Sequence, residues 1–225
     1  MRNRPTAYGL TFALPLLVWQ MVFFVAPLAF LVALSFFTVK NFRVLPDVNP
    51  ANWSVMLGRA VFWQAYGVTW VLAALGSVVA SLLAFPAAFA IAFKLSPASR
   101  RWAVFLMVIP FFTSYLVRVY AWQVFLSDAG ILNGLFAQMG FGPFALLNTP
   151  FGILVGYLTL CLPLVILLQV FSLTYVDRNL IEAAHNLRSG RIRTVFEVTI
   201  PSARVGLVIA ALFAFILCFG DFVSP

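Results

Sequence analysis

Charged and polar side chains that could bind or react are concentrated between Asp177 and Pro201. The rest of this 225-residue chain is mostly apolar. Within residues 181–201, IEAAHNLRSGRIRTVFEVTIP, apolar positions recur with helical spacing on both sides of Arg188-Ser189-Gly190. This spacing predicts two short amphipathic helices that meet at a turn, with Gly190 available for a left-handed backbone conformation. Asp177 is placed to cap the first of the two helices.

Each of these helices would carry an apolar stripe and a basic face, and such a helix has two common uses. It can lie flat on anionic lipid headgroups, or it can be presented to a protein partner in the cytoplasm. Lipid-binding helices usually carry bulky Leu, Phe or Trp, whereas Ala183 and Ala184 permit close approach of another backbone. On physical grounds alone both uses remain open.

A second group of chemically interesting residues surrounds Arg118, which lies eight residues after Pro110 in an apolar segment. Ionisable residues in such segments usually face a bundle interior or an aqueous cavity. Arg118 could instead extend toward the headgroup region, with its aromatic neighbours in the interfacial belt. The alternative is that it lines a pathway and pairs with an acid such as Asp128 or Asp221. The candidate pathway-lining residues are Tyr115, Arg118, Tyr120, Trp122 and Asp221.

The sequence lacks the residue patterns of nucleotide-binding and catalytic sites. A phosphate-binding loop has a glycine directly before its lysine, and neither Lys40 nor Lys94 follows a glycine. One histidine, His185, and six singly spaced acids provide no His-rich metal site, Ser/His/Asp set or carboxylate pair. Cys161 and Cys218 lie in apolar runs and are expected to be small buried hydrophobes. We therefore expect neither an enzyme, a metal site nor a bound cofactor.

The composition is that of a membrane protein. Hydrophobic residues make up 64% of the chain and charged residues only 9%, whereas soluble domains usually carry about 25% charged residues. A soluble fold of this size could not bury so much apolar surface, so the surrounding solvent must be lipid. The net charge of +8 therefore does not indicate nucleic-acid binding, because no soluble basic surface is expected.

Five segments are apolar and long enough to span a bilayer as helices. They cover residues 10–39, 64–93, 102–126, 151–173 and 203–222. Pro110 and Arg118 interrupt the third, and the loop at 127–150 is expected to hold one short helix near 131–139. We expect residues 1–225 to form a single all-α, polytopic membrane domain.

The distribution of Lys and Arg predicts the orientation of this domain. With the N-terminus in the cytoplasm, ten of these residues lie on the inner side, and four lie on the outer side or in the third span. Positive residues accumulate in cytoplasmic loops, so the N-terminus and the 177–201 loop are expected in the cytoplasm.

Glu182-Ala183-Ala184, Leu187 and Ile200-Pro201, with the proline 19 residues after the glutamate, closely resemble the EAA loop of ABC importer permeases. The resemblance implies a cytoplasmic loop that docks into a groove on a separate ATPase subunit and transmits ATP-driven closure. Members of this family usually have glycine at the position of Arg188, and we expect Gly190 to take over the turn. The resemblance implies the following ATPase-coupling residues: Glu182, Ala183, Ala184, Leu187, Arg188, Gly190, Ile200 and Pro201.

Two further stretches, residues 109–122 and Gly220-Asp221-Phe222-Val223-Ser224-Pro225, are similar to the spermidine/putrescine group of these permeases. The resemblance implies a bacterial inner-membrane importer of a small solute such as a polyamine. It also implies three partners: ATPase subunits that use ATP, a second permease and a periplasmic or extracellular solute-binding protein. The family usually has six spans, of which five are expected in this sequence.

Two alternatives belong to other functional classes. The chain could be a stand-alone carrier or channel whose charged loop contacts only lipid, or a membrane scaffold that transports nothing. A carrier more often holds several intramembrane acids for ion coupling, and the first, second and fourth expected spans contain none. The absence of acids from these three spans favours a permease over a stand-alone carrier.

Overall fold

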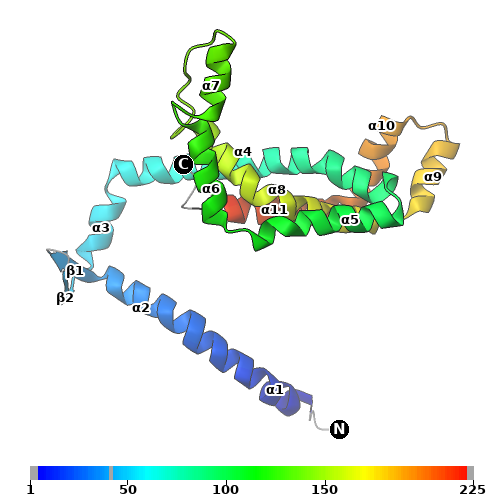
Figure 1. The fold of residues 1–225 in the computed structure, drawn as a ribbon. Coiled ribbons are helices and arrows are strands. Elements are labelled where there is room, and N and C mark those ends of the chain that lie inside the picture. Colours follow the sequence, from blue (N-terminus) through cyan, green and yellow to red (C-terminus); the bar gives the residue numbers. More distant parts are fainter. Residues whose placement is uncertain (1–4, 41–42, 222–225) are drawn as a thin grey trace. The chain divides into compact units, whose positions relative to one another are not determined.

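The computed structural model describes residues 5–40 and 43–221, and almost all of its regular structure is helical (Figure 1). The chain divides into two compact units, Met1–Tyr66 and Gly67–Pro225. The expected similarity at Phe222 to Pro225 lies outside the described residues, as do Arg2 and Arg4 of the orientation count. The position of the N-terminus therefore stays a prediction.

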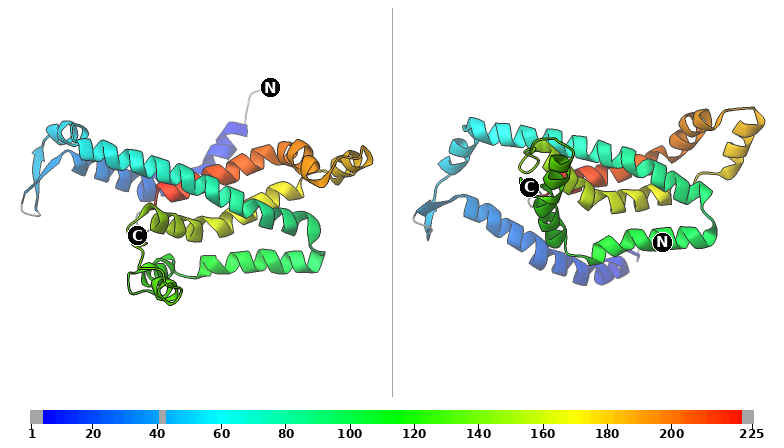
Figure 2. Two further views of the ribbon diagram at one scale, coloured as in Figure 1. Left: turned by 90° about the horizontal axis from the view of Figure 1, so that it is seen from above. Right: turned by 45° about the horizontal axis from the view of Figure 1, so that its top comes forward.

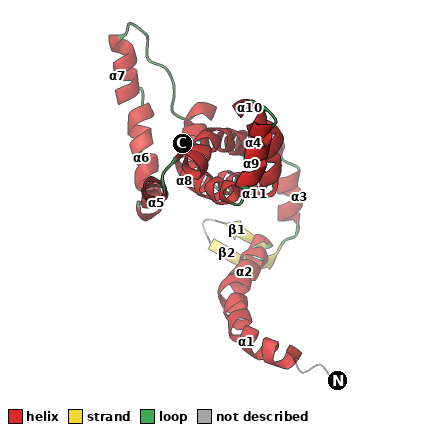
Figure 3. Ribbon diagram, turned by 90° about the vertical axis from the view of Figure 1, so that its right-hand side faces the viewer, coloured by secondary structure: helices red, strands yellow, loops and turns green. Residues whose placement is uncertain are grey.

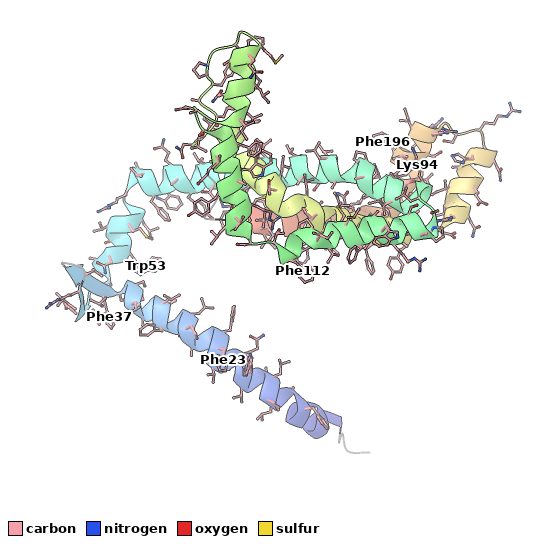
Figure 4. The ribbon with its side chains drawn as sticks, viewed as in Figure 1. Phe23, Phe37, Trp53, Lys94, Phe112 and Phe196 are labelled. Carbon is pink, nitrogen blue, oxygen red and sulfur yellow. The ribbon has the colours of Figure 1, made fainter. Side chains whose placement is uncertain are left out.

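The first unit begins with one long apolar helix. It consists of α1 (Pro5–Gln20), the π-helical turn η1 (Met21–Val25) and α2 (Ala26–Ser35). Between Phe12 and Ser35 the helix is long and apolar enough to cross a membrane. Its large apolar side chains are exposed, and Figure 4 shows Phe23 projecting from it, as expected for a helix surrounded by lipid.

This helix ends at Ser35, four residues earlier than the sequence-based boundary of 39. The next residues form β1 (Phe37–Lys40), which pairs antiparallel with β2 (Arg43–Val48), the small hairpin drawn in Figure 3. Side chains of α3 (Ala51–Leu57) form hydrogen bonds with this end of the helix and with β1. Asn52 Nδ2 donates to the carbonyl oxygen of Phe37 at 3.0 Å, and Trp53 Nε1 donates to Ser35 Oγ at 3.1 Å.

The second unit is built around three helices that run side by side in both views of Figure 2: α4 (Ala60–Phe89), α8 (Pro150–Thr174) and α11 (Ile200–Phe219). Small residues line their contacts and allow close approach. The fully buried residues of this core include Ala73, Ala80, Ala84, Cys161, Val165, Ala210, Ala214 and Cys218. As expected, the two cysteines are buried free thiols, with their sulfur atoms 3.4 Å apart.

One glycine shows how closely α8 and α11 pack. A Cβ atom placed on Gly206 would lie 2.5 Å from Cβ of Ser172. The Ser172 hydroxyl also donates to the carbonyl oxygen of Ala203 at 3.1 Å. Only a residue without a side chain fits at 206 while Ser172 keeps this position.

The third expected span is sharply bent. It runs through α5 (Pro97–Val108), the 3₁₀ turn η3 (Ile109–Phe112) and α6 (Tyr115–Leu126). Pro97–Phe112 and Tyr115–Gln138 meet at 88°. The break follows Pro110, as the sequence indicated, but falls at residues 113–114 and leaves the exposed Phe112 at the corner in Figure 4.

Among the described residues, four helices are long and apolar enough to cross a membrane. They are Phe12–Ser35, Ala60–Lys94, Pro150–Thr174 and Arg191–Phe219. The bent pair provides a fifth if it forms a single span. The all-α polytopic membrane fold is thus confirmed, and α7 (Ile131–Gln138) corresponds to the short helix expected near 131–139.

Candidate functional site

The segment of residues 177–201, called the coupling segment below, lies at one end of the second unit in Figure 1. It begins with α9 (Arg178–Asn186), and Asp177 caps this helix by accepting a 2.9 Å hydrogen bond from the backbone N–H of Asn179. The first of the two expected amphipathic helices and its cap are therefore present.

The turn after α9 is made by Arg188, which has φ of 57°. The N–H of Ser189 donates to the Ala184 carbonyl at 3.0 Å, and the N–H of Arg188 donates to the His185 carbonyl at 2.9 Å. These two bonds define a Schellman motif whose left-handed residue is usually glycine. The prediction that Gly190 would take over the turn is wrong, because Gly190 has φ of −66° and ψ of 154° and precedes the next helix.

The second half of the coupling segment is continuous with the last span. α10 (Arg191–Thr194) passes through the π-helical turn η4 (Val195–Thr199) into α11, so that Arg191–Phe219 forms one helix of 29 residues. The expected separate second helix is therefore wrong. Pro201 does not end the helix, because it lies in the first turn of α11 and the wider η4 turn precedes it.

The apolar stripe of the coupling segment is not covered by the rest of the described chain. Leu187 is 84% exposed, Ile192 is 76% exposed and Phe196 is 66% exposed. Glu182 and Ala183 are also exposed, Ala184 and Ile200 are half-buried, and Pro201 is exposed. Exposed apolar side chains next to charged residues are typical of a binding surface.

Most of the positive charge of the second unit gathers at the same end. Lys94 is the last residue of the π-helical turn η2 (Ala90–Lys94), which extends α4. Lys94, Arg178 and Arg191 all line one cavity of about 420 Å³. This clustering agrees with the assignment of this end to the cytoplasmic side by charge.

The candidate pathway residues lie elsewhere in the second unit, and the structure brings two of them into direct contact. Tyr115, the first residue of α6, donates a 2.8 Å hydrogen bond from its hydroxyl to Oδ2 of Asp221, just after α11. Both side chains line a cavity of about 430 Å³. Its other lining residues are Leu116, Leu160, Ile216, Leu217 and Gly220. The hydroxyl and the carboxylate are thus the polar side-chain groups of an otherwise apolar cavity.

Arg118 lies beside this pair. Its guanidinium carbon is 5.9 Å from the ring centre of Tyr115, within the range of a cation–π contact. Its Nη1 donates to the backbone carbonyl of Thr159 at 3.1 Å, and its Nε is buried without a hydrogen-bond partner. Arg118 is therefore held against α8 by a backbone carbonyl.

Tyr120 and Trp122 occupy different surroundings. Tyr120 is 63% exposed and is not among the residues that line the cavity. Trp122 is half-buried, and its ring centre lies 6.0 Å from that of Phe125. Helical spacing places Trp122 on the face of Arg118 and Tyr115, whereas Tyr120 points elsewhere.

Sequence reasoning missed the contributions of α8 to this site. The Thr159 carbonyl is a backbone group that any residue would supply, and Leu160 is one leucine among many, so no sequence signal marked either. Among the residues that the structure describes, no group of three or more His, Cys, Asp or Glu side chains could hold a metal ion.

No family model matches the chain. Comparison with individual known proteins does identify relatives. The spermidine/putrescine transport system permease protein PotB of Haemophilus influenzae is 30% identical over 210 residues, which cover 91% of this chain and 72% of PotB. PotB of Escherichia coli is 25% identical over 206 residues, covering 91% and 74% of the two chains.

The fold is also shared with a solved transporter. A chain from the crystal structure of a bacterial alginate ABC transporter, in complex with an alginate pentasaccharide-bound periplasmic protein, superposes with a TM-score of 0.71 at 16% identity. The superposition covers 91% of this chain and 69% of that one. The apolar helices, the coupling segment and the identity to PotB agree: this chain belongs to the permease family of bacterial ABC importers, as a multi-pass transmembrane subunit of the inner membrane.

Proposed function

We propose that residues 1–225 form one transmembrane permease domain of an importer for a polyamine such as spermidine or putrescine. In this proposal the N-terminus lies in the cytoplasm, as the distribution of Lys and Arg indicates. A separate ATPase subunit uses ATP, a second permease completes the pathway, and a periplasmic or extracellular solute-binding protein delivers the solute. The chain itself binds no cofactor.

The observation that carries the proposed coupling is the uncovered apolar stripe of Leu187, Ile192 and Phe196. Leu187 lies directly after α9, and Ile192 and Phe196 lie in the first turns of the Arg191–Phe219 helix. Such exposed apolar side chains suit a groove on a protein partner. ATP-driven closure of the ATPase would move the coupling segment, and α10, η4 and α11 would carry that movement into the bundle as a rigid body.

Two observations support a polyamine as the solute. The relatives with 25–30% identity carry spermidine/putrescine transport in their names. In this chain, the cavity beside α6 offers the carboxylate of Asp221 and the ring of Tyr115, which are groups that bind ammonium ions. The fold alone does not select the solute, since the alginate transporter shares it.

Reconstitution of the assembled complex in proteoliposomes tests this function. Spermidine or putrescine, added with the solute-binding protein, should stimulate ATP hydrolysis, whereas a neutral sugar of similar size should not. Copurification of an ATPase in detergent, with an affinity that depends on nucleotide, separates this function from a stand-alone carrier. Failure of every polyamine to stimulate hydrolysis in an otherwise active complex would overturn the proposed solute.

A further inference from the structure

A second cavity at the end of the bundle that holds the coupling segment is lined by three arginines. It has a volume of about 530 Å³ and lies between the end of η2, the start of α5 and the start of α9. Its lining residues are Phe93, Leu95, Pro97, Arg100, Arg101 and Arg178. No acid is among them. We call this space the arginine cavity.

The positive charge in the arginine cavity is not neutralised by the described part of the chain. The one ion pair among the described residues joins Arg193 to Glu197, away from this cavity. Arg100 donates to the hydroxyl of Thr174, an uncharged partner. Arg100 and Arg178 also lie in the first turns of α5 and α9, where positive charge is opposed by the helix dipole. A bound anion would therefore be favourable here.

The arginine cavity lies at the end of a helix that is long and apolar enough to span a membrane. Leu95 and Ser96 are the turn between the apolar helix that ends at Lys94 and α5, so the cavity lies where two spans leave the hydrocarbon layer. Trp102 follows directly, is 68% exposed, and packs edge-on against Phe105 with ring centres 5.8 Å apart. Exposed tryptophan is enriched at membrane–water interfaces.

A neighbouring cavity favours an amphiphile over a small inorganic anion. The 420 Å³ cavity shares Phe93 and Arg178 with the arginine cavity. Its apolar lining residues also include Phe89, Ile181, Ile192 and Val195, and its polar ones include Lys94, Glu182, His185 and Arg191. It thus offers apolar walls next to the three guanidinium groups. Leu187 and Phe196 line neither cavity and stay open to a protein partner, whereas Ile192 also lines the 420 Å³ cavity.

We propose that the arginine cavity binds the phosphate of an anionic phospholipid, with an acyl chain against Phe93 and the adjoining apolar cavity. Basic pockets between transmembrane helices on the cytoplasmic side suit such headgroups. Because Arg100 and Arg101 belong to α5 and Arg178 to α9, one phosphate would join the base of the coupling segment to the transmembrane bundle. The lipid would act as a structural component of this junction.

Native mass spectrometry of the complete chain in detergent tests the proposal. Phosphatidylglycerol should bind about tenfold more tightly than phosphatidylcholine with the same acyl chains. R100Q/R101Q should abolish that preference, since each basic residue near an anionic headgroup contributes roughly a fivefold to tenfold gain in affinity. R100K/R101K keeps the charge and should keep most of the preference.

The matched control is R188Q/R204Q, which removes two arginines that do not line the cavity. It should leave the preference unchanged. The single variant R101Q, at an exposed side chain, should lower the preference even if the double variant does not fold.

Three binding results and one crosslinking result would overturn the proposal. The binding results are equal binding of the two lipids, an unchanged preference in both R101Q and R100Q/R101Q, and displacement of phosphatidylglycerol by millimolar inorganic phosphate alone. Crosslinks from position 101 to a partner protein in the assembled complex, rather than to lipid, would equally exclude it. None of these outcomes bears on which solute is transported.

Discussion

The hydroxyl of Tyr115 and the carboxylate of Asp221 are joined by a 2.8 Å hydrogen bond across 106 positions of sequence. The bond connects the first residue of α6, directly after the bend in the third span, to the residue that follows the last helix. It therefore holds one wall of the candidate pathway to another. Because Tyr115 also lies within cation–π distance of Arg118, a movement of α6 would change the surroundings of both charged groups.

Replacing Asp221 with asparagine should impair transport of a cationic solute. The change removes the negative charge from the cavity and keeps the side-chain size. We expect kcat/KM for polyamine uptake to fall by about tenfold to a hundredfold, the range for losing an interaction with a charged group. Tyr115→Phe should cost less, about threefold to tenfold. Uptake assays in proteoliposomes measure both, with Asp47→Asn and Tyr175→Phe as matched controls at exposed positions. Wild-type uptake by Asp221→Asn would exclude a role for this carboxylate.

Changes on the exposed face of α9 should uncouple ATP hydrolysis from transport. Glu182→Lys reverses a charge, and Ala184→Trp blocks close approach of another backbone. Transport should fall at least tenfold while membrane insertion stays normal, because Glu182 is exposed and Ala184 only half-buried. Solute-stimulated ATP hydrolysis and membrane content of the protein are measured side by side. If both variants import solute normally, the coupling role of α9 is wrong.

Replacing Arg188 with glycine should stabilise the end of α9. A non-glycine residue in the left-handed conformation costs about 1 kcal/mol or more, and Arg188 has φ of 57°. We expect the amide hydrogen of Ser189, which bonds to the Ala184 carbonyl, to exchange about fivefold more slowly in the variant. Arg193→Gly is the matched control, since it places glycine inside the continuous Arg191–Phe219 helix, where it should destabilise the helix. Faster exchange in Arg188→Gly would contradict the proposed strain.

Adding a methyl group at Gly206 should destabilise the contact between α8 and α11. Gly206→Ala would place Cβ 2.5 Å from Cβ of Ser172, so one of the helices must move. We expect a loss of about 1–3 kcal/mol, typical of an overpacked core, measured by thermal unfolding in detergent. Ser172→Gly in the same chain should restore part of it. Gly134→Ala, with no atom within 4 Å of the added Cβ, is the control and should be neutral or stabilising. Equal stability of Gly206→Ala and the parent would show that the helices are not in close contact there.

The expected membrane segments could be read from the sequence because uninterrupted apolar runs have few structural alternatives in lipid. The residues at which these segments end could not be predicted from the sequence. The helix end at Ser35 accepts hydrogen bonds from Asn52 and Trp53, which are 17 and 18 residues away. The bend after Pro110 was signalled, but its angle of 88° is a tertiary feature, since α5 and α6 each contact α8.

Some of the candidate functional residues could likewise be predicted from the sequence, whereas others depend on tertiary structure. Asp177 as a helix cap follows from local chemistry, and the sequence identified it. The use of Arg188 in place of glycine was not foreseen, because the general preference of the left-handed conformation for glycine pointed to Gly190. Proximity of Tyr115 and Asp221 is a tertiary relationship, so the sequence could propose each residue for the pathway but not the bond between them.

The unbroken helix from Arg191 to Phe219 has a mechanical consequence. At 1.5 Å per residue it is a rod about 40 Å long, with its basic end in the coupling segment and its other end beside Asp221. A tilt of one degree about the basic end would shift the opposite tip by about 0.7 Å. A pivot of only a few degrees would therefore suffice to pull the carboxylate out of reach of the Tyr115 hydroxyl.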